Sequence, residues 1–141
     1  ERGDADAAYQ RLFIGPLDFE APPWGSVYLD PESVLFGDST LALRAFMRKI
    51  GATMRTGMNE PEDHIGLLLW LAADLGASDR WEELRELLGA HITPWSGRYL
   101  ELLAAHARQP FYEGLAALTA LTLAGLDAAL APTPRKAVLY R

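Results

Sequence analysis

Four ionisable side chains stand within five residues in the segment Glu60-Pro61-Glu62-Asp63-His64. A carboxylate can bind an arginine guanidinium through two parallel hydrogen bonds, and arginine is the cation best shaped for this contact. A histidine can donate to a peptide carbonyl or change its charge near physiological pH. One interpretation of the segment is therefore recognition of a basic peptide. Acid–base chemistry by Asp63 and His64, and a metal held by Glu60, His64 and a third ligand, are the alternatives.

The rest of the sequence gives little support to an enzyme. It contains no GxSxG nucleophile elbow, no P-loop, no GxGxxG and no HExxH motif. Its three histidines are widely spread and it has no cysteine, so no zinc-site spacing occurs. We therefore expect a protein that is not an enzyme and holds no metal or other cofactor. A small acidic enzyme using Asp63 and His64 remains the less favoured alternative.

A second candidate binding segment precedes this cluster, from Gly15 to Gly37. Four prolines and three glycines predict a long loop there. Between Leu12 and Leu43 the chain has five carboxylates and no Lys or Arg. We expect Trp24 and Tyr28 to form two faces of an apolar groove, although either could instead anchor the loop on its own domain.

Tyr9, Leu12 and Phe13 lie one helical turn apart just before this loop, and we expect them to line the same groove. A core position is an equally good interpretation for Leu12. Such a groove could take an apolar peptide in extended or helical form.

Composition limits the class of protein. A chain of 141 residues, 50% hydrophobic and 23% charged, predicts one globular domain over residues 1–141. The net charge of −6 argues against nucleic-acid binding and suits a basic partner. The acidic excess lies in residues 1–63, which hold 11 Asp and Glu against 6 Lys and Arg. The longest apolar run, Ile65–Ala73, is far shorter than the ~20 residues of a membrane span, so we expect no integral membrane protein.

Apolar residues recur at helical spacing in six segments, without sustained strand alternation. The predicted helices are about Asp4–Ile14, Ser39–Ile50, Asn59–Leu75, Asp79–Ala90, Thr93 to the residue before Pro110, and Pro110–Leu130. The fold class is therefore all-α, a compact helical bundle with a long loop rich in proline and aromatic residues. We expect the fourth helix to bury Trp81, and the apolar stripe of the sixth to carry Phe111, Leu115, Leu118 and Leu121.

The predicted third helix places Asp63 and His64 in its first turn. Unpaired backbone N–H groups and the helix dipole favour carboxylates at that position. The acids of this segment could therefore serve only to cap the helix, which is the structural alternative to a binding site. A similar alternative applies to His91, Pro94 and Trp95, which predict a capped turn with Trp95 in the core.

Four ordered segments resemble the signature segments of the TorD/DmsD family. They are Tyr9-x-x-Leu12-Phe13-x-Gly15-Pro16, Ala21-Pro22-Pro23-Trp24-Gly25-Ser26-Val27-Tyr28, Glu60-Pro61-x-Asp63-His64 and His91-x-x-Pro94-Trp95. The resemblance runs from about Asp4 to Phe111. It implies a cytoplasmic, all-helical chaperone that binds the twin-arginine leader of a molybdoenzyme subunit before export through the Tat system. It also implies further helices upstream of these 141 residues.

The resemblance assigns leader binding to a set of residues, most of which lie in the matching segments. These are Tyr9, Leu12, Phe13, Pro23, Trp24, Tyr28, Gly37, Glu60, Pro61, Asp63 and His64, and with less weight His91, Pro94 and Trp95. The partner implied is the twin-arginine signal peptide of a molybdenum-cofactor oxidoreductase subunit of the dimethyl sulfoxide reductase type, with Tat translocase components as a further possibility. A diverged TorD-like member that serves another oxidoreductase or its cofactor insertion is the alternative. Tyr9 and Tyr28 stand where similar family members tend to have Trp.

Overall fold

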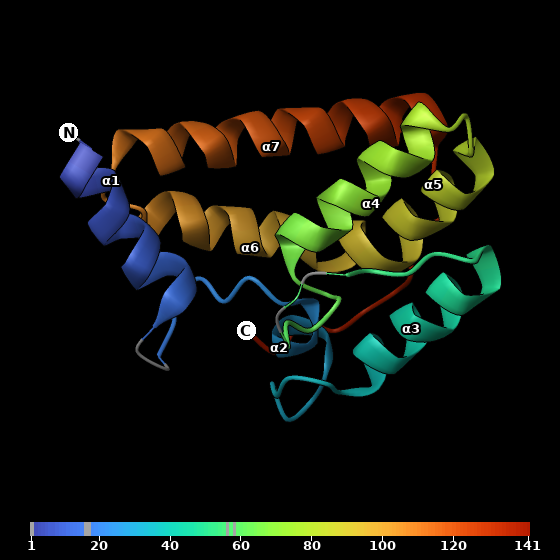
Figure 1. The fold of residues 1–141 in the computed structure, drawn as a ribbon, viewed down its shortest axis with the longest axis horizontal. Coiled ribbons are helices and arrows are strands. Elements are labelled where there is room, and N and C mark those ends of the chain that lie inside the picture. Colours follow the sequence, from blue (N-terminus) through green and yellow to red (C-terminus); the bar gives the residue numbers. More distant parts are fainter. Residues whose placement is uncertain (1, 16–17, 56, 58) are drawn as a thin grey trace. The chain divides into compact units, whose positions relative to one another are not determined.

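The computed structural model describes residues 2–15, 18–55, 57 and 59–141, and within these ranges it contains helices and no strand. The order along the chain is α1 (Arg2–Tyr9), a π-helical turn η1 (Gln10–Ile14), α2 (Gly25–Leu29), α3 (Asp38–Ile50), α4 (Ile65–Ala77), α5 (Trp81–Leu87), a π-helical turn η2 (Leu88–Ile92), α6 (Thr93–His106) and α7 (Pro110–Leu130) (Figure 1). The predicted all-α class is confirmed.

The chain divides into two compact units. One comprises Glu1–Pro23 with Gly97–Ala129, and the other Trp24–Ser96 with Leu130–Arg141. In the first unit, Leu12, Leu103 and Tyr112 are among the buried side chains. In the second, the largest fully buried side chains include Tyr28, Leu68, Leu88 and Trp95. The prediction of one domain over residues 1–141 stays a prediction.

The loop between the first two predicted helices contains a short helix that sequence patterns did not predict. Gly25–Leu29 forms α2, so the expectation of a long loop from Gly15 to Gly37 is wrong for these five residues. Trp24 is the N-cap of α2, and Tyr28 lies in its last turn. The side chain of Tyr28 is 0% exposed and stacks on Trp95 with ring centroids 5.4 Å apart. Tyr28 is therefore a core residue of the second unit and not one face of an exposed groove.

Glycine is required where α2 meets that core. A Cβ atom on Gly25 would lie 2.9 Å from Nε1 of Trp95, closer than real Cβ contacts allow. The indole of Trp95 cannot easily move away, because its Nε1 donates a 2.8 Å hydrogen bond to the carbonyl of His91. Gly25 thus permits the close approach of α2 to the Tyr28–Trp95 pair.

The helix α3 receives its cap from a residue outside the helix. Asp30 is buried, and its carboxylate accepts hydrogen bonds from the backbone N–H of Ser39 at 3.1 Å and from the Ser39 hydroxyl at 2.7 Å. A Cβ atom on Gly37 would lie 2.3 Å from Oδ2 of Asp30, so glycine leaves room for this carboxylate. At its other end α3 stops at Gly51, which has a left-handed φ of 71°.

Two expectations about helix faces are wrong. Trp81 is 46% exposed in the first turn of α5. In α7 the predicted stripe is exposed, with Leu121 at 74%, and the buried residues are Tyr112, Ala116 and Leu123. Since α7 is apolar on both faces, its periodicity could not select the buried one.

Among the described residues, α7 is the one helix long and apolar enough to cross a membrane, by length and composition alone. Its mean hydropathy is 1.4, and 11% of the apolar window is buried. Length and composition of one helix do not establish a membrane span.

Gly25→Ala should lower the free energy of unfolding by about 1–3 kcal/mol, because the new methyl group overpacks the Trp95 indole. Gly97→Ala is the matched control, since a Cβ atom on that helical glycine meets nothing within 4 Å. The control should be neutral or slightly stabilising. Denaturant titration of both variants measures the difference, and equal stabilities of Gly25→Ala and the unmodified chain would contradict the packing described.

Candidate functional site

The candidate site forms where α2 meets the segment that leads into α4. Trp24 and His64 form an isolated antiparallel bridge, and their rings meet edge to face with centroids 5.8 Å apart. The indole Nε1 of Trp24 donates a short hydrogen bond to Oε1 of Glu60. Two predicted segments, separated by about 30 residues of chain, are therefore brought together.

Asp63 is the centre of this arrangement. Its side chain is 4% exposed, and its Oδ2 accepts a 2.7 Å hydrogen bond from the backbone N–H of Ser26. Its own carbonyl accepts a 3.2 Å bond from the N–H of Gly25. Asp63 thus satisfies two of the unpaired N–H groups at the start of α2. The expectation that Asp63 lies in the first turn of α4 is wrong, since that helix begins at Ile65.

The second carboxylate oxygen of Asp63 has a different environment. Oδ1 is buried and has no hydrogen-bond partner among the residues that the structure describes. The buried hydroxyl of the neighbouring Ser26 is likewise without a partner within the described ranges. Buried polar atoms are almost always paired in native proteins, so an unpaired carboxylate oxygen calls for an explanation. One explanation is a donor supplied by a ligand.

His64 is the N-cap of α4. Its Nδ1 accepts a 3.0 Å hydrogen bond from the backbone N–H of Gly66. Burial lowers the pKa of His64 below its ordinary value, and the neighbouring carboxylates of Glu60 and Asp63 oppose this shift. The helix-capping alternative is therefore correct for His64, which caps α4. Asp63 also caps a helix, but that helix is α2 and not α4.

The remaining predicted residues fall into three groups. Pro23 and Pro61 are buried, and in the sequence they adjoin Trp24 and Glu60. Gly37 lies apart from these residues in the sequence and leaves room for the Asp30 carboxylate. Tyr9, Leu12 and Phe13 belong to the first compact unit, and their place along the groove stays a prediction. His91, Pro94 and Trp95 lie in η2 and α6, where Trp95 is a core residue as the structural alternative predicted.

In the first unit, Leu12 is buried, whereas Tyr9 keeps nearly half of its surface exposed. Tyr9 and Phe13 lie with ring centroids 5.6 Å apart, and Phe13 lies 5.7 Å from Tyr112. The core interpretation of Leu12 is therefore the one that fits its burial. Tyr9 and Phe13 form an aromatic cluster with Tyr112 in the first turn of α7.

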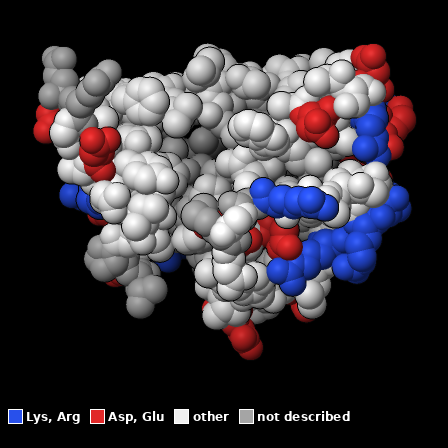
Figure 2. All heavy atoms as spheres, viewed as in Figure 1, with Lys and Arg blue, Asp and Glu red and all other residues white. Residues whose placement is uncertain are grey.

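Several acids of the first half are already paired. Oε1 of Glu20 accepts a 2.9 Å contact from Arg108 and lies 3.4 Å from Nδ1 of His106, while its Oε2 lies 3.3 Å from Arg11. Glu62 accepts a 2.9 Å bond from Arg44. Figure 2 shows Lys and Arg gathered over α3 and the loop that follows it, the region of this ion pair. The acidic excess of residues 1–63 is thus partly neutralised within the fold.

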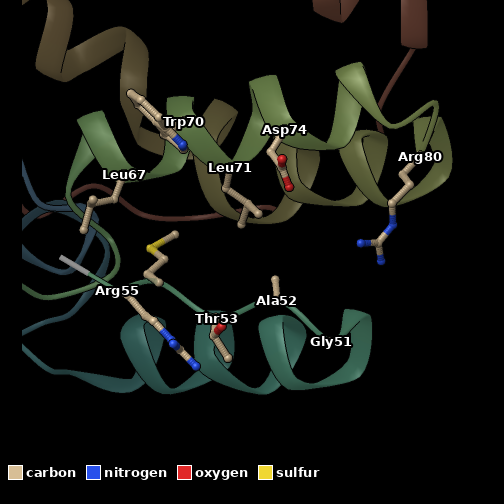
Figure 3. Close-up of a pocket in the computed structure, with 10 residues that line it drawn as sticks. Gly51, Ala52, Thr53, Arg55, Leu67, Trp70, Leu71, Asp74 and Arg80 are labelled. Atoms are coloured by element: carbon tan, nitrogen blue, oxygen red, sulfur yellow. The ribbon is translucent and has the colours of Figure 1, made fainter.

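Sequence reasoning did not single out a surface cavity of about 490 Å³ in the second unit. Its walls come from the loop Gly51–Arg55 and from Leu67, Trp70, Leu71 and Asp74 of α4, with Arg80 at one end (Figure 3). Trp70 is 80% exposed, which is unusual for so large an apolar side chain. None of the predicted site residues lines this cavity. No group of three or more potential metal ligands occurs among the described residues.

Comparison with known proteins gives a consistent set of relatives. The family model described as nitrate reductase delta subunit matches residues 1–101. The Tat proofreading chaperone DmsD of Salmonella typhimurium (strain LT2) is 56% identical over 123 residues, which cover 87% of this chain and 60% of that protein. The probable Tat proofreading chaperone DmsD of Haemophilus influenzae is 50% identical over 115 residues, 82% of this chain and 56% of the relative.

A more distant relative is the chaperone protein TorD of Shewanella pealeana. It is 27% identical over 120 residues, which cover 80% of this chain and 54% of that protein. The chain thus spans about 54 to 60% of the length of these curated relatives.

The half-buried imidazole of His91 predicts a loss of stability in acid. Burial lowers the pKa of His91 to about 4, with a further lowering by Arg135 and an opposing effect of Glu86. In the unfolded chain His91 therefore binds a proton as pH falls through about 6.5, whereas in the folded chain it does so only near pH 4. Because the unfolded state holds more protons in this window, the free energy of unfolding should fall as pH falls from about 6.5 to about 4. His91→Gln should flatten this dependence in denaturant titrations, and parallel curves for the two proteins would contradict it.

Proposed function

The chain belongs to the nitrate reductase delta subunit family, which confirms the predicted TorD/DmsD resemblance, and on that premise we propose that it binds the twin-arginine leader of a molybdoenzyme subunit and acts as a proofreading chaperone before Tat export. The activity fits a protein that works in the cytoplasm and makes no covalent change in its client. The relatives are named chaperones, which supports a binding protein over an enzyme.

One observation carries the proposal: the unpaired Oδ1 of Asp63. The carboxylate is held rigidly, because Oδ2 is fixed by Ser26 and the backbone is fixed by Gly25. A guanidinium donates through a planar array of N–H groups and pairs best with a carboxylate that does not have to reorganise. An arginine of the leader that reaches Oδ1 would satisfy the buried oxygen without breaking the contact with Ser26.

Three neighbours extend this contact into a recognition surface. Trp24 and His64 meet edge to face beside Asp63, and Glu60 is fixed by the Trp24 indole. Glu60 is half-buried and supplies a second negative charge for a cation. His64 retains partial exposure and lies at the start of α4. Glu60 and His64 are the partly exposed members of this group, and an arginine that passes them would reach the buried Asp63 beside the buried Trp24 ring.

The TorD-like alternative receives less support. TorD of Shewanella pealeana shares 27% of aligned residues with this chain, whereas DmsD of Salmonella typhimurium shares 56%. We therefore propose a client of the dimethyl sulfoxide reductase type.

Calorimetric titration of a twin-arginine leader peptide tests the role of Asp63 and His64. Asp63→Asn keeps an acceptor for Ser26 but removes the charge, so it should weaken leader affinity by about tenfold or more with little change in stability. His64→Asn keeps an N-cap acceptor for Gly66 while removing the imidazole, and should act in the same direction. The double variant should show less than the sum of both effects if the two residues hold one stretch of peptide.

Asp74→Asn serves as the control, because it removes one negative charge from the same compact unit at the unrelated cavity. The control should bind the leader as the unmodified chain does. Unchanged affinity in both Asp63→Asn and His64→Asn would exclude this site.

A further inference from the structure

The C-terminal segment of the chain, residues 131–141, crosses the two elements that carry candidate residues of the second unit. The backbone N–H of Arg135 donates a 2.8 Å hydrogen bond to the carbonyl of Gly89 in η2. The N–H of Tyr140 donates a 2.9 Å bond to the carbonyl of Tyr28 in α2. Figure 1 shows the trace leaving α7 and ending beside α2. The segment therefore joins the elements that hold His91 and Trp24.

The fold makes specific room for this segment. Gly89 is buried in η2, and a Cβ atom there would lie 2.4 Å from the carbonyl oxygen of Thr133 and 3.0 Å from its carbonyl carbon. These are backbone atoms and cannot rotate away as a flexible side chain would. The helical backbone does not itself demand glycine at this position, since no positive φ is found there. Passage of the C-terminal segment is thus a sufficient reason for a glycine at position 89.

The composition of the segment matches the chemistry of the proposed partner. It reads Arg135-Lys136-Ala137-Val138-Leu139-Tyr140-Arg141, a pair of basic residues followed by an apolar stretch. Export leaders have the same order, with a positively charged region before an apolar one. The segment thus carries the same two kinds of recognition element as an export leader.

The segment is held loosely. It has no regular secondary structure, and Val138 is 69% exposed, with Leu139 and Tyr140 also exposed. Segments with few buried apolar contacts open locally at low free-energy cost. An external peptide of similar chemistry and greater apolar length could therefore take its place.

We propose that residues 131–141 are an internal pseudoligand held against η2 and against α2, the helix whose N-cap is Trp24 of the proposed leader site, and that leader binding displaces them. This inference rests on the proposed function. The segment and the leader compete for the same place on the protein. The observed leader affinity therefore equals the intrinsic affinity multiplied by the fraction of molecules in which the segment is displaced. A loosely held segment that is bound in roughly 70–90% of molecules would weaken leader affinity by about three- to tenfold.

Gly89→Ala tests the competition without changing the segment itself. The added methyl group meets the Thr133 carbonyl and should push the segment off η2, while alanine remains compatible with the helix. Gly97→Ala is the matched control, a helical glycine with open space around its Cβ position. Gly89→Ala should bind the twin-arginine leader peptide about three- to tenfold more tightly, and the Tyr140 amide should exchange faster with solvent. The control should change neither quantity.

Deletion of residues 131–141 provides a second route to the same result. The shortened chain should bind the leader more tightly and should also bind a synthetic peptide of residues 131–141, which competes with the leader. Unchanged or weaker leader affinity after the segment has been displaced or removed overturns the inference but leaves the proposed function intact. Failure of the unmodified chain and of both variants to bind any twin-arginine leader overturns the proposed function, and the inference falls with it.

Discussion

The contact between the Asp63 carboxylate and the first turn of α2 determines the geometry of the candidate site. A five-residue helix cannot form stably on its own, because nucleation is costly and its N-terminal N–H groups lack partners. Asp63 supplies partners for Gly25 and Ser26 from the other end of a long stretch of chain. Asp30 does the same for α3 through Ser39. Two buried carboxylates therefore replace local caps and fix a loop that its prolines and glycines would leave irregular.

Local periodicity was sufficient to predict most of the helices. The helix expected at Pro110–Leu130 has those bounds in the structure, and the one expected at Ser39–Ile50 begins one residue earlier. In both cases a proline or glycine marks an end where backbone geometry allows few alternatives. The predicted start of α4 was wrong, because the acids at positions 60–63 are typical of the first turn of a helix. In the structure the Asp63 side chain instead accepts a hydrogen bond from the N–H of Ser26 in α2.

The site was predictable in its residue types and not in their roles. The acids, His64 and Trp24 were identified from the sequence, and the structure brings them together. That Tyr28 lies in the core depends on its stacking with Trp95, a contact across 67 positions of sequence that no local pattern encodes. The same limit applies to Ser26, whose N–H holds Asp63. The proline and glycine content that predicted a loop also concealed α2.

The N-cap formed by His64 has a consequence for the protonation of its ring. Because Nδ1 accepts a hydrogen bond from the N–H of Gly66, that nitrogen carries no proton and the neutral ring holds its proton on Nε2. The helix terminus thus selects one tautomer and sets the direction in which the ring can donate. Recognition of a backbone carbonyl by this donor requires no positive charge on the imidazole. The same hydrogen bond that begins α4 therefore fixes Nε2 as the donor of the neutral His64 ring.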